Sequence, residues 1–199
     1  ASWIEGLLVL FILSNLAMLG FSRLAVLIRM TAVQGVLLAA LPLLAHQGIL
    51  SAHQWGLCAG ILILKGVVFP MLLGRAQREA NVAREDEPFV SCTLSLFAGL
   101  LALWVSLWLA ARLPLPPETP SPLVLPVAFF TIFVGLFVIV ARKKALTQVV
   151  GYLTLENGIY AFGIGVAQEW PLIVELGILL DIFAAVFVMG IAIFHISRE

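Results

Sequence analysis

Residues 123–141, LVLPVAFFTIFVGLFVIVA, contain no charged side chain, and this run decides the fold. A bilayer core about 30 Å thick is crossed by a helix of roughly 20 apolar residues, which is the length of this run. The rest of the chain has the same character. Of its 199 residues, 62% are hydrophobic and 11% are charged, and the mean hydropathy is +1.13. A soluble domain does not have this composition, so the sequence predicts an integral membrane protein.

Seven such runs follow one another and predict an all-α bundle of about seven transmembrane helices. A membrane β-barrel needs short segments of alternating polarity, whereas these runs are apolar on every face. We expect one continuous membrane domain with five helices in residues 1–141 and two in residues 142–199. The charged residues 74–88 and the proline-rich residues 112–122 are predicted loops. The expected spans are 3–21, 24–45, 53–73, 89–111, 123–141, 146–167 and 171–194.

The lysines and arginines predict the orientation, because they accumulate in cytoplasmic loops. They occupy the first, third and fifth connections and the C terminus, whereas the other connections hold only Arg112. The N terminus is therefore expected outside and the C terminus in the cytoplasm. Because the basic residues are explained by topology, the zero net charge gives no indication of nucleic-acid binding. The residues behind this prediction are Arg23, Arg29, Arg75, Arg78, Arg84, Arg142, Lys143, Lys144 and Arg198.

Catalytic, cofactor-binding and metal-binding residues are not expected within this chain. Cys58 and Cys92 stand alone in different predicted helices, and no histidine has metal-ligand spacing, so an iron–sulfur cluster, a zinc site or a nickel centre is not predicted. His46, His53 and His195 are explained as interfacial residues. No phosphate-binding glycine loop is present. We also find no internal repeat, which weakens a transporter interpretation.

Three ionisable residues are predicted near the middle of the membrane: Lys65, Glu156 and Asp181. A charge at that depth costs about 2.5–3.5 kcal/mol on insertion scales, so each residue is a functional candidate by default. Each lies about nine to fourteen residues from a predicted helix end, and at about 1.5 Å per residue all three share one level. Glu175 lies nearer the outer face and is a secondary candidate.

The neighbours of these residues favour a role in proton transfer. Tyr152 and Tyr160 are spaced four residues before and after Glu156, so their hydroxyls are expected to donate hydrogen bonds to its carboxylate or to hold a water beside it. On the face of Asp181, small residues such as Gly177 would let another helix approach the acid.

The helix that carries Lys65 is expected to be irregular. Lys65 precedes Gly66 and Pro70, which loosen backbone hydrogen bonding and open a place where water can enter. A structural explanation stays open, in which Glu156 and Asp181 are neutral acids hydrogen-bonded between helices and Lys65 pairs with one of them. Three such residues at one depth weaken it, since each adds its own insertion penalty. A buried carboxyl that can hold or release a proton instead favours a relay.

A resemblance covers the C-terminal part of the chain. From Arg142 on, RKKALTQVVGYLTLENGIYAFGIGV followed by LGILLDIFAAVFVMGIAIFHISR resembles the K-type subunit of respiratory complex I and of multisubunit cation/proton antiporters. The shared order is a basic loop, a helix with GxxxxEN before Ala161 and Phe162, and a last helix with a central acid. With the additional helices in front, the whole chain is similar to component E of membrane-bound, energy-converting nickel–iron hydrogenases of the formate-hydrogenlyase type.

Two positions depart from the K-type pattern, although the resemblance still implies a proton relay there. Glu156 falls one helical turn later than the usual glutamate, and Asp181 stands where relatives usually carry glutamate. The resemblance assigns the relay to Glu156 and Asp181, and it carries nothing over to Lys65, which lies outside the matching region. In our own interpretation Tyr152 and Tyr160 orient Glu156, and Lys65 tunes its charge.

The resemblance implies a noncatalytic membrane-arm subunit of a complex I-related, energy-converting hydrogenase or similar oxidoreductase complex, in a bacterial or archaeal cytoplasmic (inner) membrane. This subunit would contribute its intramembrane acids to proton or sodium translocation. The implied partners are antiporter-like membrane subunits, a membrane anchor subunit, and soluble hydrogenase and iron–sulfur subunits. These partners would carry the nickel–iron centre and the iron–sulfur clusters. Two alternatives stay open: a stand-alone ion-coupled secondary transporter, and an assembly scaffold without a relay role.

Overall fold

The computed structural model describes residues 2–45, 52–79, 90–114, 119–166, 177, 179–188 and 190, and its elements are helices. A helix is favoured in a membrane because it satisfies its backbone hydrogen bonds within one segment, and the apolar side chains suit the lipid. A π-helical turn, Leu64–Val68, joins α3 to α4 in one continuous helix. The helices are α1 (Ser2–Gly20), α2 (Leu24–Ala45), α3 (Ala52–Ile63), α4 (Phe69–Glu79), α5 (Cys92–Ala110), α6 (Val124–Ala141) and α7 (Ala145–Val166). A further helix includes Leu179–Val188 and is referred to below as the last helix.

Within the described residues, six helical spans are long and apolar enough to cross a membrane: α1, α2, the continuous α3–α4 helix, α5, α6 and α7. They correspond to the first six predicted spans. The described part of the seventh, Leu179–Val188, is apolar but shorter than a span, and the rest of residues 171–194 lies outside the described ranges. The prediction of an all-helical membrane protein is confirmed. The count of seven and the division of the chain after residue 141 stay predictions.

The third span is longer than predicted. Its helix continues to Glu79, although the sequence pattern placed its end at Leu73 and a loop over residues 74–88. The reason is that α4 is amphipathic and buries an apolar stripe along its length. Across the last turn, Arg75 Nε lies 2.7 Å from Glu79 Oε1, a spacing that supports a helix. The charged residues 75–79 therefore extend a helix and do not begin a loop.

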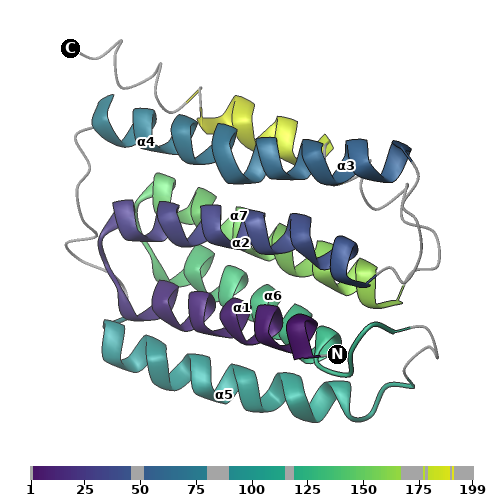
Figure 1. Ribbon diagram of the computed structural model, residues 1–199. Coiled ribbons are helices and arrows are strands. Elements are labelled where there is room, and N and C mark those ends of the chain that lie inside the picture. Colours follow the sequence, from purple (N-terminus) through teal and green to yellow (C-terminus); the bar gives the residue numbers. More distant parts are fainter. Residues whose placement is uncertain are drawn as a thin grey trace.

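The helices form a row of layers (Figure 1). The α3–α4 helix and the last helix make one edge layer, α2 and α7 follow, α1 and α6 come next, and α5 lies at the opposite edge. The closest pair is α6 and α7. A Cβ added at Gly151 or Gly158 of α7 would come within 3.0 Å of the α6 backbone, so only glycine permits this separation. The row runs across the helix axes, and therefore in the plane of the membrane.

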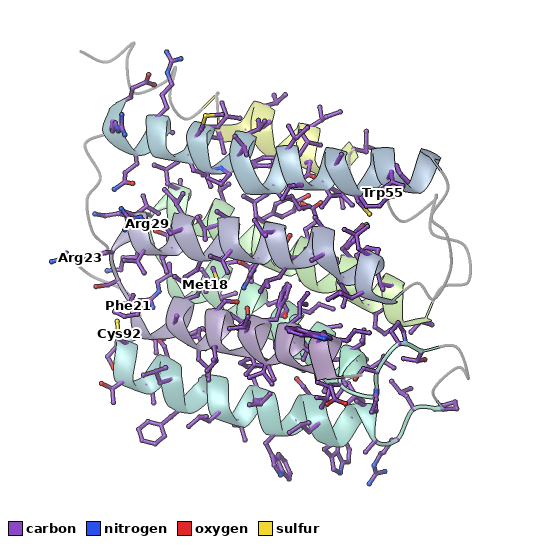
Figure 2. The ribbon with its side chains drawn as sticks, viewed as in Figure 1. Met18, Phe21, Arg23, Arg29, Trp55 and Cys92 are labelled. Atoms are coloured by element: carbon purple, nitrogen blue, oxygen red, sulfur yellow. The ribbon has the colours of Figure 1, made fainter. Side chains whose placement is uncertain are left out.

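Basic residues gather at one end of the bundle. Figure 2 shows Arg23 and Arg29 at this end and Trp55 at the other. Arg142, predicted as one of the basic loop residues, is only 1% exposed, and its Nη2 donates to the Leu19 carbonyl oxygen at 3.4 Å. The positive charge of Arg142 offsets the partial negative charge of the carbonyl groups at the C-terminal end of α1. Which end faces the cytoplasm stays a prediction.

Candidate functional site

Lys65, Glu156 and Asp181 meet at one point between the α3–α4 helix, α7 and the last helix. Lys65 Nζ lies 2.9 Å from Glu156 Oε1 and 3.0 Å from Asp181 Oδ1, and it donates a hydrogen bond to the Asp181 oxygen. The three residues are 5%, 3% and 3% exposed, respectively. One ammonium group therefore bridges two buried carboxylates from different helices. We refer to these three residues as the ion triad.

The position of Lys65 depends on the π-helical turn Leu64–Val68, where the helix is wider than an α-helix. Such turns are rare, and they frequently occur at functional sites. Pro70 has no N–H to bond the carbonyl four residues earlier, that of Gly66, so the α-helical hydrogen-bond pattern is broken at this point. The predicted irregularity beside Lys65 is confirmed.

Gly35 of α2 supports the π-helical turn from the inner side, and sequence reasoning missed it. A Cβ added at Gly35 would lie 2.7 Å from the carbonyl carbon and from the Cβ of Lys65. The two backbones are therefore in direct contact, which only glycine permits. This contact fixes the height and rotation at which Lys65 enters the bundle.

The last helix approaches Glu156 through Gly177. A Cβ added at Gly177 would lie 3.7 Å from Glu156 Oε1 and 4.0 Å from Tyr160 Cδ2. These are ordinary van der Waals distances, so the prediction that small residues let a helix approach Asp181 closely stays a prediction. Glu175, the secondary candidate, lies outside the described residues.

The tyrosine hydroxyls do not donate directly to Glu156. Apart from the ion pair with Lys65, the Glu156 carboxylate has no side-chain hydrogen-bond partner among the described residues, so the direct bonds expected from Tyr152 and Tyr160 are absent. The alternative expectation, a water held beside the carboxylate, stays a prediction. Tyr160 packs into an apolar cluster with Ile61 of α3. Tyr152 lines an apolar cavity of about 230 Å³, together with Phe183 and others. Helical spacing gave the correct face of α7, but the rings pack against apolar neighbours.

A second polar group, made only of neutral side chains, lies beside the triad. Asn157 Nδ2 donates to Gln34 Oε1 at 3.2 Å, and Gln34 Nε2 donates to Asn15 Oδ1 at 2.8 Å and to Ser14 Oγ at 3.1 Å. Asn15 Nδ2 donates to Thr131 Oγ1 at 2.8 Å. All five residues are 4% exposed or less. We refer to Ser14, Asn15, Gln34, Thr131 and Asn157 as the neutral cluster.

Sequence reasoning missed the neutral cluster because it considered only ionisable residues. The sequence did contain a signal for this cluster, because Asn15 and Gln34 lie near the middle of apolar runs. The sulfur of Met18, which is labelled in Figure 2, adds a further contact. It lies 3.6 Å from Gln34 Nε2 and 3.6 Å from Thr154 Oγ1. Buried polar groups need such partners because an unpaired one is costly in a membrane.

The triad and the neutral cluster lie next to each other. On both α7 and α2, one residue contacts the triad and its neighbour in the sequence belongs to the cluster. Glu156 contacts Lys65, whereas the next residue of α7, Asn157, contacts Gln34. On α2, Gln34 joins the cluster while Gly35 contacts Lys65. The polar residues thus follow the row of layers in Figure 1, from the edge layer through α7 and α2 to α1 and α6. Within the described ranges, no three histidine, cysteine, aspartate or glutamate side chains are placed to hold a metal.

Comparison with known proteins relates the chain to a family. An uncharacterised protein of Mycobacterium tuberculosis (strain ATCC 25618 / H37Rv) is 37% identical over 178 residues, covering 86% of this chain and 78% of that protein. The chain belongs to the family of that protein. Hydrogenase-4 component E of Escherichia coli (strain K12) is 31% identical over 133 residues, covering 66% of this chain and 61% of the component. The component E of Shigella flexneri gives the same values.

The family is therefore linked by homology to a hydrogenase-4 subunit. The matching part of the chain spans less than two thirds of the length of component E. No family profile matches the chain, and no solved structure matches it. The expected resemblance of residues 142–199 to the K-type subunit of complex I stays a prediction.

Proposed function

We propose that this chain is a noncatalytic membrane subunit of an energy-converting hydrogenase or a similar complex I-related oxidoreductase complex, and that the ion triad takes part in proton or sodium translocation. The homology to hydrogenase-4 component E and the six apolar spans support membership in such a complex. The observation that carries the relay is the position of Lys65 between Glu156 and Asp181.

The charge of the triad supports exchange of one ion. With all three groups ionised, one ammonium faces two carboxylates, and the site keeps one negative charge inside the membrane. An isolated buried charge is costly, and uptake of one proton or one sodium ion removes it. A purely structural pair would need Lys65 and a single acid. The second acid therefore favours a site that takes up and releases one cation.

Lys65 can link the two acids through two neutral arrangements. With the proton on Glu156, the Lys65 ammonium is the counter-ion of ionised Asp181, and with the proton on Asp181 it is the counter-ion of Glu156. Changing from one arrangement to the other moves a proton between the helices without creating an unpaired charge. Such a two-state element is what transmission between neighbouring subunits needs. The Lys65 side chain needs little movement for this change, because its Nζ already lies within 3.0 Å of an oxygen of each acid.

The proposed partners are antiporter-like membrane subunits, a membrane anchor subunit, and soluble hydrogenase and iron–sulfur subunits that carry the metal centres. The proposed location is the cytoplasmic membrane of a bacterium or archaeon. The expected test of partners is purification of the tagged chain in mild detergent, followed by mass spectrometry and nickel and iron analysis. A metal-free chain that is stable alone and moves ions in liposomes would instead indicate a secondary transporter.

Neutral variants of the acids test the relay. In inverted membrane vesicles, Glu156→Gln or Asp181→Asn is expected to lower ion translocation per complex by about tenfold or more, because each removes a proton-exchanging group. Electron transfer in the soluble subunits should be unchanged. Glu5→Gln is the matched control, since Glu5 is an exposed acid in the first turn of α1. Normal translocation in both variants would contradict the relay, and a loss of assembled complex alone would indicate a scaffold.

A further inference from the structure

We propose that the neutral cluster is an ion barrier. It closes the bundle on the side of α1 and α6, so that the triad exchanges protons only through the edge layer formed by the α3–α4 helix and the last helix. The importance of this barrier for translocation rests on the proposed function. The barrier itself can be tested without any translocation measurement.

The hydrogen bonds of the cluster end on groups that cannot pass a proton on. Thr131 Oγ1 donates to the Val127 carbonyl oxygen at 2.7 Å, and Ser14 Oγ donates to the Phe11 carbonyl oxygen at 2.7 Å. Each hydroxyl hydrogen is therefore held by a backbone acceptor of its own helix. A backbone carbonyl accepts hydrogen bonds and has no proton to release.

Gln34 is the centre of the barrier. Its two amide hydrogens are directed to Asn15 and Ser14, and its carbonyl oxygen accepts from Asn157. An amide is not ionised near neutral pH, so it cannot take up a proton on one side and release it on the other. A proton that reaches the triad therefore finds no carrier beyond Asn157 in the part of the chain that the structure describes.

Toward α5, the side chains beyond the cluster are apolar, and the buried Arg142 lies at the basic end of the bundle, where it bonds the Leu19 carbonyl oxygen. Leu19, Phe130, Val134 and Val138 form a buried group between α1 and α6, and residues of α5 pack against it. The buried serines of α5, Ser95 and Ser106, donate to carbonyl groups of their own helix or of its N-terminal cap. Among the described residues, no polar path continues from Thr131 toward α5.

The opposite side of the triad is one helix layer thick. Lys65 belongs to the edge layer itself, and the outer surface of this layer exposes Val67 and Met71. A groove of about 660 Å³ begins at Gly66, the residue next to Lys65, and extends along α4 to Arg78. This groove connects the turn that carries Lys65 with the basic end of the bundle. Exchange through the edge layer is therefore the short route.

The hydrogen bonds of the cluster resist opening of the helices, because a gap wide enough for water must break several of them together. One acceptor of the cluster, Asn157 Oδ1, has no partner among the described residues, and it lies at the end of the cluster next to the triad. The same bonds hold α7 against α2 and keep Glu156 on the side of Lys65. The barrier thus also maintains the geometry of the triad.

Hydrogen–deuterium exchange of glutamine side chains tests the barrier in the wild-type protein. The intact complex, with ¹⁵N-glutamine in this chain and embedded in lipid nanodiscs, is transferred to D₂O and followed by NMR. The Gln34 amide hydrogens are expected to exchange at least roughly tenfold more slowly than those of Gln77, which is only partly buried on α4. Similar rates for the two residues would overturn the proposal, because water would then reach the cluster.

A variant that breaks the cluster gives an independent test. Gln34→Ala removes the hydrogen bonds to Asn157, Asn15 and Ser14, so the side-chain amide of Asn15, followed with ¹⁵N-asparagine, is expected to exchange at least roughly tenfold faster than in the wild-type complex. Gln77→Ala is the control and should leave the Asn15 rate unchanged. If Gln34→Ala does not assemble, Asn157→Ala replaces it. An assembled variant with an unchanged Asn15 rate would contradict the barrier. The outcomes are separable, because slow Gln34 exchange would persist even if Glu156→Gln translocates normally.

Discussion

Gly35 and Lys65 are in backbone contact across the α2 interface. A Cβ at position 35 would lie 2.7 Å from the Lys65 carbonyl carbon, closer than packing permits. The residue that carries the central charge of the triad is therefore positioned by a residue without a side chain. The first prediction concerns this contact.

Gly35→Ala is expected to push the π-helical turn away from α2. Overpacking of this kind typically costs about 1–3 kcal/mol, and it should lower both thermal stability and translocation. Gly60→Ala is the matched control, because an added Cβ at Gly60 meets nothing within 4 Å. The measurement is thermal unfolding of the complex in detergent. Equal unfolding temperatures for the two variants would contradict the contact.

Lys65→Met removes the only described counter-ion of the two acids. Breaking a buried ion pair by removing one partner costs about 3–5 kcal/mol, so the yield of folded complex should fall. The triple variant Lys65→Met, Glu156→Gln, Asp181→Asn is expected to regain much of the stability while still failing to translocate. Thermal unfolding of the single and triple variants measures this coupling. If the loss of stability in the triple variant equals the sum of the losses from the single substitutions, the three residues do not form one unit.

Thr131→Val leaves Asn15 Nδ2 without its acceptor inside the bundle. The expected loss is about 1–3 kcal/mol in the free energy of unfolding, which is the typical cost of a buried unpaired group. Thr31→Val is the control, because buried Thr31 donates only to the Leu27 carbonyl of its own helix. Both variants replace a threonine hydroxyl by a methyl group. Chemical denaturation therefore compares the loss of a hydrogen bond between helices with the loss of one inside a helix. A similar loss in both would show that the cluster adds nothing to stability.

Arg142→Met removes the buried cation at the end of α1. The interaction of such a charge with a helix terminus contributes up to about 2 kcal/mol in partly buried geometries, so a loss of this order is expected in thermal unfolding. Arg112→Met is the control. Arg112 lies over the Trp108 ring at 4.2 Å, where the contact contributes about 0.5–1 kcal/mol at exposed sites. A larger effect at Arg112 would contradict the prediction.

The sequence predicted the individual members of the triad, because a charged group in an apolar run is marked by its own insertion penalty and counting along a helix gives its depth. It left the pairing of Lys65 open, since helices that are apolar on every face do not show which helices are neighbours. The close approach of Gly35 to Lys65 has the same origin. Asn15 and Gln34 were overlooked because amides carry no charge that marks them. The extension of the third span to Glu79 was missed because charged residues were interpreted as a loop, although a helix can extend beyond the bilayer core.

The π-helical turn Leu64–Val68 has a consequence for how the gene can change. Such a turn contains one residue more than an α-helical turn, so α3 and α4 differ in phase by about 100° from a continuous helix. Loss of a single codon within this turn would remove the extra residue and rotate α4 relative to α3. Leu73 and Ala76 would then leave the core even though neither had been replaced. An in-frame deletion in this turn is therefore expected to be more damaging than most substitutions. The number of residues in the turn matters as well as their identity.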